Sequence, residues 1–362
     1  MKHGVVNRTT DGYFKYQGWP TLAKDDRGVF YVACSGHRVA HVCPFGKNLV
    51  YISEDQGETW SAPMIWNDTP FDDRDAGLLF LNGGRTLLTY FNNPVNFYYE
   101  RANWAVDNTM QPCPRTMTTG VLLDWKNISD ERISGGSYLK IYDNYGKTLV
   151  KTIKMPITAP HGPCILNDGN LLYVGKECHS GIAEMNREDI YVYLSKNCGE
   201  EWDQIAAIHL PASVKPEECY FCEPHAVQAN DGTIIAAIRA ERSGHPEGFT
   251  TYLTYSDDGG HTWSEPVSMD CHGAPPHLML HSSGAIVLTY GRRISPYGIR
   301  ARISYDCGRS FGEEIVLRDD APDWDVGYPS TVELKDGSLL TAYYQKYDND
   351  NYPSILYTKW SL

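Results

Sequence analysis

The chain has 362 residues, of which 42% are hydrophobic and 21% are charged, and its formal net charge is −13 at pH 7. This composition is typical of a globular protein, and the length suits about two or three average domains or one large all-β unit. The negative charge excludes nucleic acid as the main partner, because a polyanion would be repelled.

The chain contains no run of about 18 apolar residues, so we expect no membrane-spanning segment and no membrane partner. Its first residues, MKHGVVNRTTDGYFKYQ, lack the apolar stretch of a secretion signal. We therefore expect a cytoplasmic protein whose ten cysteines are free thiols. Cys219 and Cys222 form the only close pair. Because no second pair follows at zinc-site spacing and no βαβ context surrounds them, we expect no metal and no cofactor.

Four segments of the chain share the pattern Ser-x-Asp-x-Gly-x-(Thr/Ser)-aromatic, and each follows an alternating apolar strand. They are SEDQGETW at 53–60, SKNCGEEW at 195–202, SDDGGHTW at 256–263 and SYDCGRSF at 304–311, with Asn197 and Glu201 as departures in the second copy. In such a box the Asp side chain can accept hydrogen bonds from turn N–H groups, and Gly can adopt a positive φ. The pattern predicts tight hairpin turns.

A second series of turns interleaves with these boxes. Its glycines follow one another 52 to 85 residues apart, in the turns Arg27-Gly28, Gly83-Gly84, Asp168-Gly169, Asp231-Gly232, Ser283-Gly284 and Asp336-Gly337. Each unit then consists of strand A, a Gly turn, strand B, a loop, strand C, a box turn and strand D. Six such units predict an all-β fold, a six-bladed β-propeller with four-stranded antiparallel blades. Two stacked β-sandwiches would not explain the interleaved turns.

We expect residues 1–362 to form a single propeller domain. The second unit carries an insertion at about 92–118, with Tyr98, Tyr99 and Trp104, which should extend a loop on the binding face. No helical periodicity of useful length is present. The sixth unit ends early, so residues near 3–17 should supply its closing strand.

Functional side chains are expected at one end of the propeller, which we call the mouth. The A–B and C–D turns lie on one rim of the propeller. The other rim therefore holds the first residues of strands A and C, which we call their entries, and the last residues of strand B, which we call its exit. The strand A entries are Trp19-Pro20, Arg74-Asp75, Pro160-His161, Glu223-Pro224-His225, Pro276-His277 and Tyr328-Pro329. The B exits with their loops supply His37, Arg38, His41, Glu177, His179, Arg239, Arg242, Arg292 and Arg293, and Arg300 begins strand C of the fifth unit. Such a rim on an acidic protein indicates a cationic pocket for a small acidic molecule.

The boxes resemble the Asp-box repeats of the sialidase (neuraminidase) superfamily over nearly the whole chain. Two segments carry the resemblance further, CEPHAVQANDGTIIAAIR at 222–239 and GYPSTVELKDGSLLTAYY at 327–344. The resemblance implies that Tyr328 is the nucleophile, Glu223 the base that activates it and Arg239 a ligand of the substrate carboxylate. The alternative for each is structural, namely a rim tyrosine and an ion pair between Glu223 and Arg239.

The first unit departs from the family pattern. Gly18-Trp19-Pro20 stands where sialidases have Arg-Ile-Pro, so Arg74 or Arg38 would have to replace the missing arginine. The B–C loop SGHRVAHVCPFGKN has no Asp to act as the acid, which leaves His41 or His37 in that loop and Asp75 in the next blade.

Spacing does not choose the family's third arginine among Arg292, Arg293 and Arg300. His161, His225 and His277 adjoin prolines at equivalent strand entries and are candidate pocket residues, with strand capping as the alternative.

The chemistry of a sialic acid suits this set of residues, because its anomeric carbon carries a carboxylate. Arginines bind a carboxylate in bidentate fashion, and a neutral Tyr nucleophile is not repelled by it as a carboxylate would be. The sequence thus predicts a retaining exo-glycosidase that releases a terminal sialic acid or related acidic sugar from a small glycoside or glycoconjugate. Two alternatives are a lyase or hydrolase acting on another acidic sugar (uronate or rhamnoside) through His and Tyr, and a non-catalytic sugar-binding propeller. The sequence predicts no particular oligomeric state.

Overall fold

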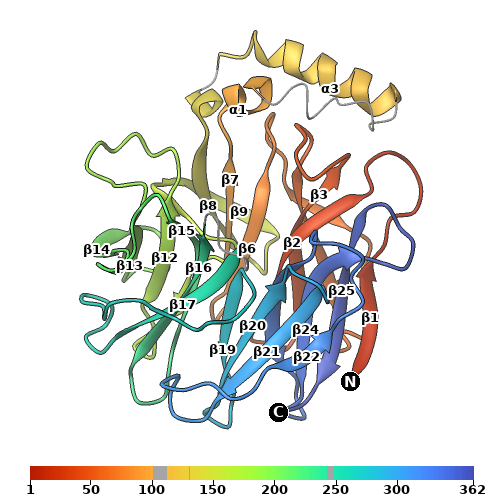
Figure 1. Ribbon diagram of the computed structural model, residues 1–362. Helices are drawn as coiled ribbons and strands as arrows, with labels where there is room; N and C mark the ends of the chain where they lie inside the picture. The colour runs from red at the N-terminus through yellow and green to blue at the C-terminus, as the bar shows by residue number, and fades with distance from the viewer. Residues whose placement is uncertain (101–111, 130, 243–247) are drawn as a thin grey trace.

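The computed structural model describes residues 1–100, 112–129, 131–242 and 248–362. Strands dominate these residues and form six antiparallel sheets, the blades, whose inner strands contact one another in a ring (Figure 1). The predicted all-β class and six-bladed β-propeller are confirmed.

Blades one to three follow one another along the chain, and within each blade the strands run in order from the inner to the outer one. Blade one contains β2 (Tyr16–Lys24), β3 (Phe30–Arg38), β4 (Lys47–Ser53) and β5 (Met64–Asn67). Blade two contains β6 (Arg74–Phe80), β7 (Thr86–Asn92), β8 (Gly136–Asp143) and β9 (Thr148–Met155). In blade three the inner strand is divided into β10 (Ile157–Thr158) and β11 (Cys164–Ile165), followed by β12 (Leu171–Glu177), β13 (Ile190–Ser195) and β14 (Asp203–Ile208).

Blades four to six complete the ring in the same order. Blade four contains β15 (Cys219–Gln228), β16 (Ile234–Arg242), β17 (Phe249–Ser256) and β18 (Val267–Ser268). Blade five contains β19 (Pro276–Leu280), β20 (Ile286–Arg292), β21 (Gly298–Ser304) and β22 (Ile315–Arg318). Blade six contains β23 (Gly327–Glu333), β24 (Leu339–Lys346), β25 (Pro353–Trp360) and β1 (Lys2–Asn7).

Blade six is closed by the two ends of the chain, as predicted. The N-terminal β1, red in Figure 1, pairs antiparallel with the C-terminal β25, blue, with Gly4 opposite Tyr357 and Val5 opposite Leu356. A Cβ at Gly4 would lie 2.2 Å from the ring of Tyr357, so this close pairing requires glycine. The N- and C-terminal segments thus share one sheet, which joins the last blade to the first.

The glycine turns between the inner two strands of the blades have the predicted conformation. The six glycines have φ values between 80° and 94°, a region that disfavours residues with a Cβ, and they are Gly28, Gly84, Gly169, Gly232, Gly284 and Gly337. Because each turn joins the innermost strand of its blade to the next one out, the six A–B turns share one rim.

The Ser-x-Asp-x-Gly segments form the predicted turns between the third and fourth strands. Asp258 Oδ1 accepts a hydrogen bond from the backbone N–H of Thr262 at 2.9 Å, and Ser256 Oγ accepts one from the N–H of Gly260 at 2.9 Å. In the second copy, Asn197 Oδ1 takes the place of the carboxylate and accepts the N–H of Glu201 at 3.0 Å. The amide oxygen therefore preserves the backbone contact of the turn.

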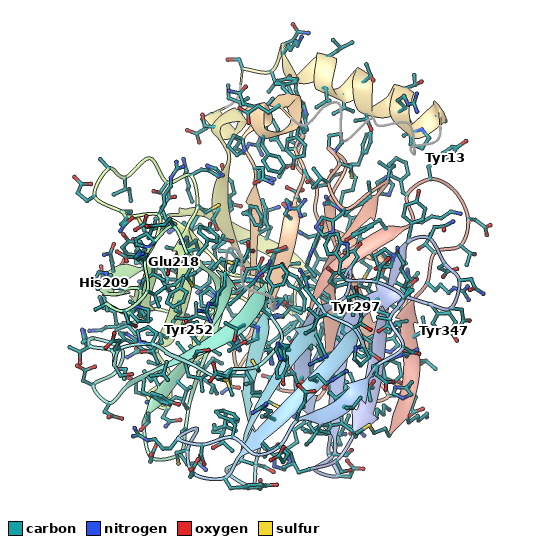
Figure 2. The ribbon with its side chains drawn as sticks, viewed as in Figure 1. Tyr13, His209, Glu218, Tyr252, Tyr297 and Tyr347 are labelled. Carbon is teal, nitrogen blue, oxygen red and sulfur yellow. The ribbon has the colours of Figure 1, made fainter. Side chains whose placement is uncertain are left out.

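The hydrophobic core lies between neighbouring sheets rather than in one central mass. Between blades three and four, Leu172 and Val174 share a buried cluster with Ala236 and Ile238. Tyr252, labelled in Figure 2, packs in the same cluster with its ring 5.1 Å from that of Phe221. Each large apolar side chain buried in this way contributes about 1.5–3 kcal/mol, so the interfaces between blades hold the ring together.

The insertion of blade two is helical, which the sequence analysis did not predict. Between β7 and β8 lie α1 (Val95–Glu100), α3 (Pro112–Trp125) and a 3₁₀ turn (Glu131–Ser134), at the end of the molecule opposite both termini (Figure 1). The helical part extends beyond residue 118, and Trp104 lies outside the described residues.

The helices of the insertion are held by packing rather than by a strong helical pattern of their own. Trp125 and Leu122 of α3 pack with Tyr98 of α1 and with Phe71, and the Trp125 indole N–H donates to the carbonyl of Pro70 at 2.8 Å. Tertiary contacts therefore stabilise a segment whose Thr, Gly and Pro residues are poor helix formers. No helix among the described residues has the length and apolar character needed to cross a membrane.

The box turns give the first testable prediction. Hydrogen bonds from Thr262 lower the pKa of Asp258 to about 2, so the charged carboxylate stabilises the turn above the pKa of an unfolded Asp. We expect Asp258→Ala to lower the free energy of unfolding by about 1 kcal/mol in urea titrations at pH 7. Asp258→Asn is the matched control and should retain most of that stability, as Asn197 does.

The contribution of the charged Asp258 should disappear as the pH falls from about 4 towards 2, since the carboxylate is then protonated in both states. Equal urea midpoints for the wild type and Asp258→Ala at pH 7 would contradict this role of the box.

Candidate active site

Four blades aim one residue each into the mouth by the same backbone device. The antiparallel register of the inner strand shifts in β2, β6, β15 and β23, and each shift contains a non-glycine residue with positive φ. These residues are Trp19 (φ 57°), Asp75 (47°), Glu223 (48°) and Tyr328 (50°). A bulge with a left-handed residue turns that side chain out of the plane of the blade, and such strain is concentrated at functional sites.

Tyr328 and Glu223 meet at the centre of the mouth. The Tyr328 hydroxyl donates a hydrogen bond to Glu223 Oε1 at 2.5 Å, although the two residues come from blades six and four. Arg239 of β16 donates from Nη1 to Glu223 Oε2 at 2.5 Å and to the Tyr328 hydroxyl at 3.3 Å. Burial and then the charge of Glu223 raise the pKa of Tyr328 well above its usual value. The resting phenol is therefore neutral and has a carboxylate in place to accept its proton.

Asp75 lies on the same side of the mouth as Glu223. Both line a cavity of about 420 Å³ between blades two, three and four. Burial raises the pKa of Asp75 to about 7, and the negative charge of Glu223 adds to this effect. Asp75 therefore titrates near neutral pH, the range that suits a general acid.

His41 lies in the B–C loop of blade one, within a separate hydrogen-bond network. Its Nδ1 is 3.0 Å from Asp325 Oδ1 and 2.7 Å from the hydroxyl of Tyr16. The hydroxyls of Tyr16 and Tyr344 each donate to the same Asp325 oxygen at 3.0 Å. Burial lowers the pKa of His41, while the carboxylate of Asp325 acts against this shift. The ring of His41 packs edge-on against Trp19, with centroids 5.1 Å apart.

Arg239 and Arg293 flank Tyr328. The guanidinium carbons of Arg239 and Arg293 lie 4.7 and 5.6 Å from the centre of the Phe249 ring, and that of Arg293 lies 5.5 Å from the Tyr328 ring. Arg293 also donates to the carbonyl of Val326 at 3.0 Å and to the hydroxyl of Tyr344 at 3.1 Å.

Arg74 approaches the mouth from blade two. Its guanidinium lies 4.3 Å from the centre of the Trp19 ring, and Nη1 is 3.3 Å from Asp72 Oδ2. Three of the predicted arginines, Arg74, Arg239 and Arg293, therefore surround Trp19 and Tyr328.

Arg239 is itself paired, through Nη1 with Glu223 and through Nη2 with Glu241 at 2.6 Å, but these pairs lie at the site. Arg38 and Arg300 pair with the protein elsewhere. The fully buried guanidinium of Arg38 pairs with both carboxylate oxygens of Asp72. Arg300, which is 2% exposed, donates to Glu314 at 3.1 Å and to the carbonyls of Ile299, Arg318 and Pro296. The structure does not bring these two arginines to the Tyr328–Glu223 pair, because acceptors within their own blades and loops occupy them.

His161, His225 and His277 gather in a different cavity, of about 460 Å³, which lies further along the inner strands towards the A–B turns. Their ring centroids are 4.4 to 5.5 Å apart. Burial lowers the pKa of all three, that of His225 to about 4, so the rings are neutral. Among the described residues no cluster of His, Cys, Asp and Glu is arranged to hold a metal ion.

A family model described as a BNR repeat-like domain matches residues 136–341, more than half of the chain. The chain belongs to the BNR repeat-like domain family. No curated protein matches it significantly in sequence.

Solved structures show what the BNR repeat-like fold of this chain resembles. A protein of unknown function from Dyadobacter fermentans superposes with a TM-score of 0.76 and 21% identity, covering 99% of this chain and 98% of its own. The NanB sialidase of Streptococcus pneumoniae has a TM-score of 0.71 and 13% identity over 99% of this chain and 70% of its own. A leech intramolecular trans-sialidase has a TM-score of 0.66 and 14% identity, covering 100% of this chain and 70% of its own. The predicted resemblance to the sialidase superfamily is confirmed for the fold.

Sequence reasoning missed Asp325, Tyr344 and Phe249 in this BNR repeat-like propeller. Asp325 lies three residues before Tyr328, in the loop that leads into β23. That short spacing was a usable signal, because residues just before a strand A entry also reach the mouth. The ring of Phe249, which bridges two arginines, had no comparable signal.

The network around His41 gives a prediction that does not depend on any substrate. Removing the charge of Asp325 should lower the pKa of His41 further, since that carboxylate favours the protonated imidazole. We expect a lower His41 titration midpoint in Asp325→Asn, measured from imidazole nitrogen and carbon shifts by NMR. Asp320→Asn is the control, because Asp320 pairs with Arg318 at 2.6 Å instead. An unchanged midpoint in folded Asp325→Asn would show that the ion pair is not formed.

Proposed function

We propose that this protein is a retaining glycoside hydrolase that releases a terminal sialic acid or a related acidic sugar. The observation that carries the proposal is the 2.5 Å hydrogen bond from the Tyr328 hydroxyl to Glu223, with Arg239 and Arg293 on either side. A non-catalytic sugar-binding site has no need of a phenol paired with a base. The fold shared with sialidases supports the same activity by analogy.

In the proposed first step, the phenolic oxygen of Tyr328 attacks the anomeric carbon and its proton passes to Glu223. Arg239 and Arg293 bind the substrate carboxylate, with Arg74 completing the cationic wall, so the charge beside the reacting carbon is neutralised. The bond to the leaving oxygen breaks as that oxygen takes a proton. Water then cleaves the glycosyl–tyrosine bond and configuration is retained.

Asp75 is our choice for the acid that protonates the leaving oxygen. Its pKa of about 7 leaves a substantial share of it protonated at neutral pH and most of it below, and it lines the same cavity as Glu223. When Glu223 takes the phenol proton, its negative charge disappears, and the pKa of Asp75 falls at that moment. Attack and proton release to the leaving group are then coupled. His41 is the second choice, because it does not line that cavity and its ring packs against Trp19.

The His41–Asp325 pair favours one second candidate, a lyase acting on a uronate. There, His41 would take a proton from the carbon beside the carboxylate, and a double bond would form as the bond to the leaving oxygen breaks. Tyr328 would donate its own phenolic proton to that oxygen. A lyase releases an unsaturated sugar with a new ultraviolet absorbance, whereas a hydrolase does not, so a product spectrum separates the two.

The role of Tyr328 predicts a loss of turnover without a loss of folding. Tyr328→Phe removes only the hydroxyl, and we expect kcat for a fluorogenic sialoside to fall at least about 100-fold. Glu223→Gln and the double variant should be impaired to a similar extent, because the two groups act as one unit. Tyr343→Phe, a buried tyrosine of the same blade outside the mouth, is the matched control and should retain activity. Near-normal turnover by a folded Tyr328→Phe variant would refute the nucleophile.

The role of Asp75 predicts an effect that depends on the leaving group and on pH. Asp75→Ala should reduce turnover of natural glycosides about 100-fold and of activated aryl glycosides far less, since a good leaving group needs no proton. For the wild type, turnover of natural glycosides should fall as the pH rises through about 7, because Asp75 then loses its proton. Equal losses on both substrates in Asp75→Ala would assign it a positioning role, and a selective loss in His41→Ala would transfer the acid to His41.

A further inference from the structure

The cavity beside Asp75 and Glu223 extends away from Tyr328 towards blade three. Its walls come from blades two, three and four and include Lys176, His179 and Tyr220. Lys176 stands near the end of β12, opposite Ile190 of β13 and Thr158 of β10. The proposed mechanism uses none of these wall residues.

Lys176 is a buried ammonium without an acceptor. The residue is 5% exposed, and its Nζ makes no hydrogen bond with any described residue. Its one close neighbour of note is the ring of Tyr220, whose centre lies 4.2 Å from Nζ. A cation–π contact stabilises a cation by about 0.5–2 kcal/mol, which is less than the cost of burying an unpaired charge.

Apart from Asp75, whose pKa burial raises to about 7, the carboxylates that line the cavity are engaged with other groups. Glu177 accepts the backbone N–H and the hydroxyl of Ser180 at 2.7 and 2.8 Å. Glu241 accepts Nη2 of Arg239 at 2.6 Å, while Glu223 takes Nη1 of the same arginine and the Tyr328 hydroxyl. Lys176 thus lines the cavity with a buried positive charge that no described group accepts.

The ammonium of Lys176 is charged at neutral pH. Burial lowers its pKa to about 8, while Asp189 and other nearby acids act against this shift, so most molecules still carry the proton at pH 7. A buried charge that pairs with nothing in the protein destabilises the fold, and such residues are characteristic of ligand sites.

We propose that Lys176 binds a second anionic group of the substrate, a carboxylate on the leaving sugar. The substrate class is then an acidic sugar linked to another acidic sugar, with the first carboxylate at Arg239 and Arg293 and the second at Lys176. The leaving sugar occupies this cavity because Asp75, the proposed acid, lines it. The assignment rests on the proposed function for the identity of the first sugar.

The first experiment compares two substrates that differ in the leaving sugar. An α2,8-linked dimer of sialic acid carries a carboxylate there, and 3′-sialyllactose does not. We expect Lys176→Met to raise KM for the dimer on the order of 10- to 100-fold, the range for a lost charged hydrogen bond, and to change KM for sialyllactose less than about 2-fold.

Lys140→Met is the matched control, because Lys140 also lies over a tyrosine ring, 5.8 Å from the centre of Tyr90, but is only partly buried and belongs to blade two. An equal change in KM for both substrates, or no change for either, overturns the proposal.

The second experiment needs no turnover. Inorganic sulfate at constant ionic strength, balanced with sodium chloride, serves as the probe, and thermal unfolding is followed. We expect sulfate to raise Tm of the wild type and of Lys140→Met, and to raise Tm of Lys176→Met by less than half as much. An unchanged sulfate response in Lys176→Met overturns the subsite even if sialosides are hydrolysed. A reduced response in a protein that hydrolyses no sialoside supports the anion site and rejects the proposed substrate instead.

Discussion

Four inner strands of this propeller interrupt their pairing at the mouth with one residue in the left-handed region, and the candidate site depends on that constraint. Trp19, Asp75, Glu223 and Tyr328 hold φ values of 47° to 57°. A non-glycine residue there costs about 1–3 kcal/mol, and the regular pairing on both sides of each bulge offsets that cost. Without the bulges, these side chains would point to the faces of their own blades, as alternate residues of a regular strand do. With them, the Tyr328 hydroxyl reaches a carboxylate 105 residues away in sequence.

Buried charges in the mouth are organised around a few acids that each serve several partners. Asp72 pairs with Arg38 and Arg74 and also accepts the hydroxyl of Tyr98 at 2.5 Å. Tyr98 belongs to α1, so the helical insertion contributes to the support of Arg74. On the opposite side, Asp325 collects Tyr16, His41 and Tyr344. Asp72 thus fixes the arginines of the mouth, and Asp325 fixes its tyrosines and His41, as a preorganised site requires.

The replacement of an arginine by Trp19 at the first strand entry changes the way the cationic wall is built. The indole offers its face to Arg74 and Arg38, whose guanidinium carbons lie 4.3 and 4.9 Å from its centre. Arg38 pairs closely with both oxygens of Asp72. Arg74 lies 3.3 Å from one of them, so its positive charge is less fully compensated and is more available to a ligand. A wall made in this way differs from the arginine at the first entry that the sialidase resemblance implies. Beside it, Tyr328, Glu223 and Arg239 contact one another directly.

The amino-acid sequence by itself determined the six units, the two series of turns, the closing role of the N-terminal residues and the placement of Tyr328, Glu223, Asp75 and Arg239 at one mouth. These follow from local physics, since turn chemistry and strand alternation act over a few residues. The helix α3 was beyond such reasoning, because packing on Tyr98 and Phe71 stabilises a segment with weak intrinsic propensity.

Only the tertiary structure decided which charges pair with the protein and which face the cavity. Arg38 and Arg300 share the polarity and the rim position of Arg293, yet Asp72 and Glu314 engage them. His41 finds Asp325 across 284 residues of chain, and Lys176 finds no acceptor among the described residues. Charge pairing depends on which groups the folded chain brings within a few ångströms, in the same blade for Arg300 and Glu314 and between blades for His41 and Asp325. That information lies in the tertiary packing and not in the order of residues along any one strand.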